Sequence, residues 1–131
     1  MQTNRLYRII LPVADIERAA NFYSGVFRNP GERFSPGRHY FDCGGTILAC
    51  YDPVADGDGG KDSWHFHPKQ YLYFAVPDLK AILGFLQATG GTVDEGIATM
   101  PWGERLFYAR DPFGNPICFV DDRTLFTSGK K

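Results

Sequence analysis

The fold is decided at residues 11–23, which read LPVADIERAANFY and contain a change from strand to helix. Apolar residues run almost continuously up to Val13, as in a buried strand, and then recur at helical spacing. Asp15 stands between the two patterns, where its carboxylate can accept a hydrogen bond from the free amides of a first helical turn. The stretch therefore predicts a strand over residues 6–13 and an amphipathic helix that begins after Asp15.

This transition occurs a second time in the chain. At an offset of 63 positions, Val13, Asp15, Ile16 and Phe22 are matched by Val76, Asp78, Leu79 and Phe85. At an offset of 69, Gly45, Ala49 and Asp52 are matched by Gly114, Cys118 and Asp121. An internal repeat of this kind predicts two modules built on one plan.

Each half continues with three short strand candidates separated by turn residues. In the first half they lie at residues 32–35, 38–43 and 46–51. In the second half they lie at residues 92–98, 104–109 and 116–120, after a strand at 70–76 and a helix that ends at Gly90.

We predict an α+β fold of two βαβββ modules, residues 4–52 and 70–122, within a single domain of residues 1–131. Residues 53–69 are rich in Asp, Gly, Pro and Lys and form the connector. The curved mixed sheets are expected to surround a cavity, with the helices outside.

Composition restricts the partners and the compartment. A net charge of -1 without a basic stripe argues against nucleic acid, and the absence of a long apolar run argues against a membrane span. The cysteines Cys43, Cys50 and Cys118 are odd in number and have no metal-finger spacing. With no signal peptide pattern at the start, the sequence predicts a cytoplasmic protein with reduced thiols.

Aromatic residues are abundant, with 11 Phe, 7 Tyr and 2 Trp, which is more than a core of this size needs unless some rings line a ligand cavity. Strand alternation separates Tyr7, Leu11 and Val13, expected to pack on the helix, from Arg8 on the opposite face. In the second half the same alternation places Tyr71, Tyr73 and Cys118 on the less apolar faces. These faces are candidates for a concave site.

The closing segment, residues 111–120, reads DPFGNPICFV. Together with the duplicated modules and the helix entry at residues 11–23, it resembles the vicinal oxygen chelate superfamily, which includes glyoxalase I, bleomycin-resistance proteins and extradiol dioxygenases. The resemblance covers roughly residues 4–122, and residues 101–115 are most similar to the bleomycin-resistance proteins. It implies a homodimer, because members often complete their sites with a second chain and isologous dimers are common.

The resemblance also implies where metal ligands would lie. Metal-dependent members place His, Gln or Glu at positions that fall here on Arg8, Tyr71, Cys118 and Ala49, or on Leu48 or Cys50 if the register shifts by one residue. Arginine has no lone pair to donate, and alanine has no donor atom. Tyr71 and Cys118 alone are too few ligands, so no metal cofactor is expected.

Three histidines offer other metal candidates. His65 and His67 alternate, which would place both imidazoles on one side of an extended segment as in some zinc sites. The alternative is a loop with two surface histidines, because no third ligand is specified nearby. His39 stands alone and is no better a candidate.

Arg8, Cys118 and Trp102 each allow two interpretations. Arg8 binds an anionic ligand, or it forms an ion pair with Glu104 or Asp42 or extends to solvent. Cys118 is a nucleophile if a cation lowers its pKa, or a small buried apolar residue. Trp102 is presented at a cavity mouth, or it packs in the core.

The leading functional hypothesis is a metal-independent protein that binds a small aromatic or anionic molecule through Arg8, Tyr71, Tyr73, Trp102 and Cys118. The alternative is a metal-dependent glyoxalase-like lyase or isomerase, or a dioxygenase, with displaced ligands. A structural or regulatory module without a ligand is the third possibility. The sequence predicts no catalytic residue and leaves open whether the protein is an enzyme.

Overall fold

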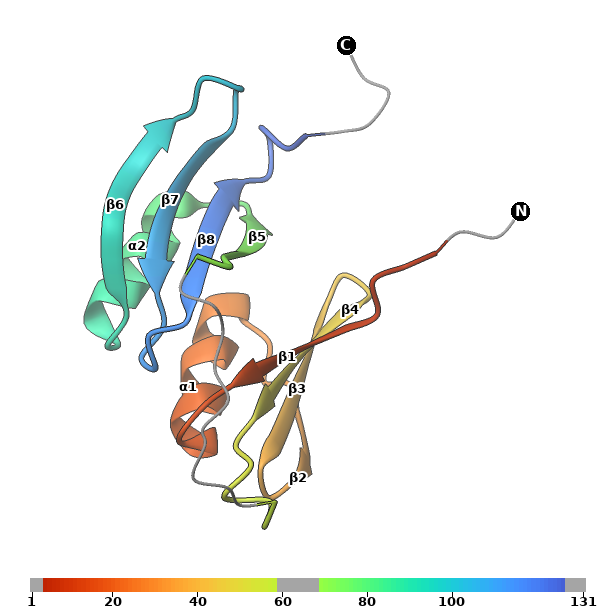
Figure 1. The fold of residues 1–131 in the computed structure, drawn as a ribbon. Helices are drawn as coiled ribbons and strands as arrows, with labels where there is room; N and C mark the ends of the chain where they lie inside the picture. The colour runs from red at the N-terminus through yellow and green to blue at the C-terminus, as the bar shows by residue number, and fades with distance from the viewer. Residues whose placement is uncertain (1–3, 59–68, 127–131) are drawn as a thin grey trace. The chain divides into compact units, whose positions relative to one another are not determined.

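A computed structural model describes residues 4–58 and 69–126 of the chain (Figure 1). The chain divides into two compact units, residues 1–66 and 67–131. Each unit contains one βαβββ module with a four-stranded mixed sheet and one helix, which confirms the predicted α+β fold. Within the described residues, neither helix has the length and apolar character needed to cross a membrane.

The first unit consists of β1 (Arg8–Pro12), α1 (Ile16–Phe27), β2 (Glu32–Ser35), β3 (Arg38–Cys43) and β4 (Thr46–Tyr51). Its sheet has the strand order β1-β4-β3-β2, so β1 and β2 are the edges. Strand β1 runs parallel to β4, whereas β3 is antiparallel to both β4 and β2. The bounds of β2, β3 and β4 are those that the turn residues predicted.

Helix α1 covers one face of this sheet. Phe41 of β3 is fully buried, and its ring centroid lies 6.3 Å from that of Tyr23 and 5.5 Å from that of Phe27. Leu11 and Val13 are buried, as expected for the helix-packed face of the first strand. The same expectation is wrong for Tyr7, which precedes β1 and is exposed.

The second unit consists of β5 (Leu72–Val76), α2 (Leu79–Ala88), β6 (Thr92–Thr99), β7 (Arg105–Arg110) and β8 (Pro116–Asp121). Its strand order β5-β8-β7-β6 repeats the topology of the first sheet, with β5 parallel to β8. Phe74 stacks on Phe119, and Phe107 packs against Phe119 with a tilted ring, on the face that corresponds to the helix-covered face of the first unit. Alternate residues of β5, β7 and β8 therefore lie on the opposite face.

The two helices begin with the same cap, as the repeat predicted. The Asp15 carboxylate accepts a hydrogen bond from the Arg18 amide at 3.1 Å, and the Asp78 carboxylate accepts one from the Ala81 amide at 3.1 Å. Both caps have an extended backbone, with φ/ψ of -150°/103° at Asp15 and -145°/96° at Asp78. The equivalence of the two modules thus extends to local geometry.

The closing motif forms a tight turn before β8, in which Asp111 and Asn115 are buried. Oδ1 of Asp111 accepts hydrogen bonds from the backbone amides of Phe113 and Asn115, both at 2.9 Å, and Oδ2 accepts one from Asn115 Nδ2 at 2.9 Å. Gly114 adopts a φ of 84°, in the left-handed region that favours glycine. The motif that carries the resemblance therefore has a structural role, because its turn positions the start of β8.

Candidate functional site

The face of the first sheet that points away from α1, called here the open face of the first unit, carries residues from all four strands. Strand pairing aligns Ile10 with Ala49 and Ala49 with Tyr40 across the sheet. Arg8 lies two residues before Ile10 on β1 and therefore shares this face. Leu48 and Cys50 lie on the opposite, helix-covered face and are buried. The register thus places Ala49, rather than either neighbour, on the face of Arg8.

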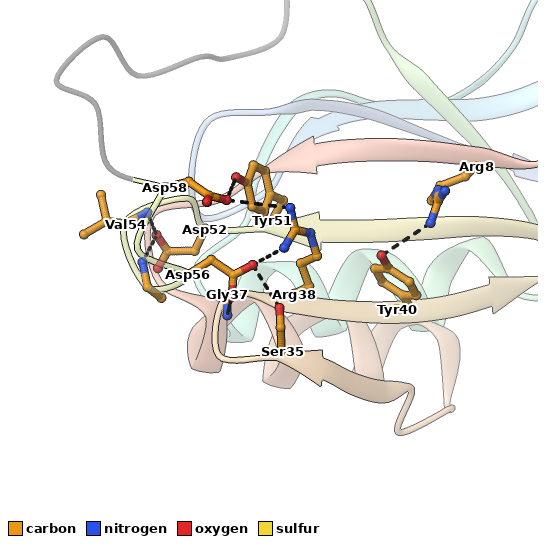
Figure 2. A network of polar contacts seen from close by, with 11 residues as sticks. Arg8, Ser35, Gly37, Arg38, Tyr40, Tyr51, Asp52, Val54, Asp56 and Asp58 are labelled. Atoms are coloured by element: carbon orange, nitrogen blue, oxygen red, sulfur yellow. Dashed lines mark hydrogen bonds and ion pairs between the residues drawn. The ribbon is translucent and has the colours of Figure 1, made fainter.

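Arg8 contacts aromatic groups on the open face. Its Nη1 donates a hydrogen bond to the Tyr40 hydroxyl at 3.4 Å, a contact that reaches across β4 (Figure 2). The Arg8 guanidinium carbon lies 5.8 Å from the Tyr40 ring centroid and 5.2 Å from that of Tyr7, within the range of cation–π attraction. Arg8 is therefore surrounded by π-systems at the exposed end of β1.

Arg8 has no carboxylate within ion-pair distance among residues 4–58. The Asp42 carboxylate, one predicted partner, instead accepts a hydrogen bond from the Gly45 amide at 2.7 Å. Glu104, the other predicted partner, belongs to the second unit and accepts a hydrogen bond from the Trp102 indole. Among residues 4–58, no carboxylate neutralises the positive charge of Arg8.

The other arginine on the open face, Arg38, is fully engaged. Its guanidinium lies 4.4 Å from the Tyr51 ring centroid and forms ion pairs with Asp56 and, at 3.7 Å, with Asp58 (Figure 2). Asp58 also accepts a hydrogen bond from the Tyr51 hydroxyl. Burial acts to raise the pKa of Asp56, but hydrogen bonds from Ser35, the Gly37 amide and Arg38 hold it below its ordinary value. This network anchors the residues after β4, so Arg38 serves the fold.

Phe34 lies beside Tyr40 and was not singled out from the sequence. The β2–β3 pairing shifts register between Arg33 and Ser35, and Phe34 is the residue at this irregularity. Its ring stacks on Tyr40 with centroids 5.2 Å apart and planes inclined by 7°. Phe34 nevertheless remains 69% exposed, so one side of the stacked pair faces solvent.

The corresponding open face of the second unit carries a tyrosine cluster. Tyr71 and Tyr73 both contact Tyr108, with centroids 5.1 and 6.4 Å apart and interplanar angles of 69° and 85°. A hydrogen bond with Tyr73, followed by burial, raises the pKa of Tyr108 to about 12. Tyr108 therefore remains a neutral phenol at physiological pH.

Cys118 is fully buried beside this cluster, next to Leu106 and Val120. Burial, with a smaller effect of the Glu104 carboxylate, raises the pKa of the Cys118 thiol to about 12. The protonated thiol is a poor nucleophile, so the structure favours the apolar interpretation of Cys118. All three cysteines, Cys43, Cys50 and Cys118, are free thiols.

Trp102 lies in the turn between β6 and β7 and is 63% exposed. Its Nε1 donates a hydrogen bond to Glu104 Oε1 at 2.8 Å, which fixes the indole at the surface. The core-packing alternative for Trp102 is therefore wrong.

The sequence of the chain matches the model of one protein family over most of its length. Residues 5–119 match the family model of the Glyoxalase/Bleomycin resistance protein/Dioxygenase superfamily. The chain belongs to this superfamily. No curated protein matches the sequence.

Several solved structures share the fold of this chain. A glyoxalase/bleomycin resistance protein from Albidiferax ferrireducens T118 is 25% identical, with a TM-score of 0.72 over 88% of this chain and 97% of that chain. An integron cassette protein from V. Cholerae is 26% identical, with a TM-score of 0.65 over 92% and 97%. A family enzyme from Burkholderia phytofirmans PsJN is 18% identical, with a TM-score of 0.74 over 93% and 100%, and this likeness concerns the fold alone.

The side chains at the positions where the resemblance implies metal ligands do not fit a divalent metal. Arg8 and Ala49 have no lone pair to offer, and the Tyr71 phenol and Cys118 thiol both have raised pKa values. No group of three His, Cys, Asp or Glu residues suited to a metal occurs within residues 4–58 and 69–126. His65 and His67 lie outside the described residues.

His39 has a structural role. It is buried, its Nδ1 accepts a hydrogen bond from Arg33 Nε at 3.2 Å, and its Nε2 lies 2.8 Å from the Pro30 carbonyl oxygen. Both ring nitrogens are therefore engaged in holding β2 and β3 near the end of α1.

Proposed function

We propose that this superfamily member binds a small anionic or aromatic molecule without a metal, and that Arg8 on the open face of the first unit holds the anionic group. The observation that carries the proposal is that no carboxylate pairs with Arg8 in the described part of its unit. Arg38, on the same face, is paired with two carboxylates, whereas Arg8 contacts two aromatic rings and has no carboxylate partner among residues 4–58.

A guanidinium has five N–H donors in a planar fork that matches a carboxylate or phosphate. One donor of Arg8 contacts Tyr40 at 3.4 Å, a long hydrogen bond that a charged acceptor can replace. Burying the guanidinium beneath a neutral ligand would carry a desolvation cost that an anion offsets. The charge and geometry of Arg8 therefore favour an anionic ligand.

In the second unit, we propose that Tyr71, Tyr73 and Trp102 contact the ligand. Cys118 belongs to the buried apolar cluster against which Tyr71 packs. Support comes from the exposure of the Tyr73 and Trp102 rings, which leaves their faces available for stacking. These contacts are independent of Arg8 and are tested by separate substitutions.

The substitution Arg8→Met tests the proposal, with benzoate as an anionic probe and benzamide as a neutral probe of the same shape. Losing one charge-assisted hydrogen bond should weaken benzoate binding by about 2 kcal/mol, or about thirtyfold, and leave benzamide binding nearly unchanged. Arg18→Met, which removes an exposed arginine on α1, is the matched control and should affect neither probe.

Calorimetric titration of the wild type and both variants gives the comparison. An equal loss for both probes in Arg8→Met, or a loss for neither, would assign Arg8 a structural role and refute the proposal.

A further inference from the structure

We infer that the anionic group held by Arg8 belongs to a planar aromatic molecule, and that Phe34 and Tyr40 form the platform that selects its ring. This inference rests on the proposed function of Arg8 and adds the ligand class, an aromatic carboxylate, together with two selecting residues.

The platform is already assembled in the structure. Phe34 and Tyr40 stack nearly parallel, at 7° and 5.2 Å, and come from neighbouring strands of one sheet. The register shift in β2 occurs at Phe34, and β-bulges re-aim side chains next to functional sites. An exposed phenylalanine in a short edge strand thus has a defined orientation.

Tyr40 connects the platform with the cation. Its ring stacks on Phe34. Its hydroxyl accepts the hydrogen bond from Arg8 (Figure 2). The Phe34 and Tyr40 ring centroids are 5.2 Å apart, and the Arg8 guanidinium carbon lies 5.8 Å from the Tyr40 centroid. The inferred ligand places its ring against the stacked pair and its carboxylate at Arg8. The ring would continue the stack, and the carboxylate would take the place of the Tyr40 hydroxyl at Arg8.

Charge and shape favour this occupant over an aliphatic acid. An aliphatic carboxylate could pair with Arg8, but it would not gain the quadrupole attraction between stacked rings. Exposed side chains of Tyr7 and Ile10 flank Arg8 and extend the apolar surface around the charge. A single exposed phenylalanine needs no explanation, but a stacked pair beside a cation that lacks a carboxylate partner in the described segment 4–58 predicts a flat, anionic ligand.

Two carboxylates of equal charge and similar size distinguish the contribution of the aromatic ring to binding from that of the charge. Benzoate and cyclohexanecarboxylate are titrated into the ¹⁵N-labelled chain, and amide shifts report both affinity and location. The wild type should bind benzoate about fivefold more tightly. In Phe34→Leu this ratio should fall to about one, with cyclohexanecarboxylate affinity unchanged.

Two further variants are the controls. Phe126→Leu removes a phenylalanine that is 82% exposed elsewhere in the chain, and it should keep the fivefold ratio. Arg8→Met should weaken both carboxylates to the same extent and preserve the ratio. The amide spectrum of Phe34→Leu verifies that the exposed substitution leaves the fold intact.

The outcomes distinguish this inference from the proposed function. If the wild type binds both carboxylates equally, or if Phe34→Leu weakens both equally, the inference is overturned while anion binding by Arg8 stands. If neither carboxylate binds, the proposed function fails and the inference fails with it.

Discussion

Replacing Asp111 with alanine should destabilise the second unit by about 3 kcal/mol. The Asp111 carboxylate is 2% exposed and accepts three hydrogen bonds of 2.9 Å, from the amides of Phe113 and Asn115 and from Asn115 Nδ2. A hydrogen bond to a charged group contributes about 1.5–3 kcal/mol, and the three share one carboxylate and are not additive. Relaxation of the turn recovers part of the loss, which gives the value of about 3 kcal/mol.

Urea unfolding followed by circular dichroism and tryptophan fluorescence measures this change. The control is Asp15→Ala, which removes a cap that accepts one hydrogen bond of 3.1 Å at an exposed helix start and should cost about 1 kcal/mol. If Asp111→Ala costs no more than Asp15→Ala, the carboxylate does not hold the turn as argued. The turn matters for the site because β8 begins at Pro116 and carries Cys118.

The remaining predictions concern pH, capping and assembly. The pKa values of Cys118 and Tyr108 are raised to about 12 in the folded state, so these groups lose their protons at lower pH in the unfolded state. Ionisation therefore favours the unfolded state, and the melting temperature should fall as pH rises above about 9. Cys118→Ala should flatten this dependence, and an unchanged slope would contradict the burial argument. Asp78→Ala should cost about 1 kcal/mol, equal to Asp15→Ala, in the same urea experiment. Light scattering should give the mass of a homodimer, and a monomer that persists at all concentrations would exclude one.

Local chemistry explains which parts of the fold were predictable. The helix starts at Asp15 and Asp78 follow from capping, which depends on residues within one turn. The strand bounds of β2, β3 and β4 follow from Gly and Pro residues at the intervening turns. The topology of the second module was predictable from the βαβββ repeat, because equivalent residues recur in the same order in both halves.

The features that escaped prediction depend on contacts between distant residues. Phe34 joins the candidate site because the β2–β3 register shifts beside it, and no local pattern specifies such a shift. The hydrogen-bond partner of Arg8 is Tyr40, which is 32 positions away along the chain. Tyr7 fits the apolar alternation of the first strand, but β1 begins one residue later and leaves its ring exposed.

The central claim, metal-independent binding of an anion, is tested most directly by one titration. Benzoate is titrated into protein that has been treated exhaustively with a chelator, and again after addition of Zn²⁺, Ni²⁺, Mn²⁺ or Fe²⁺, with the bound metal quantified in each sample. We expect the same dissociation constant for benzoate in every sample, with less than one bound metal ion per chain. Benzoate binding that appears only with a stoichiometric metal ion would contradict it.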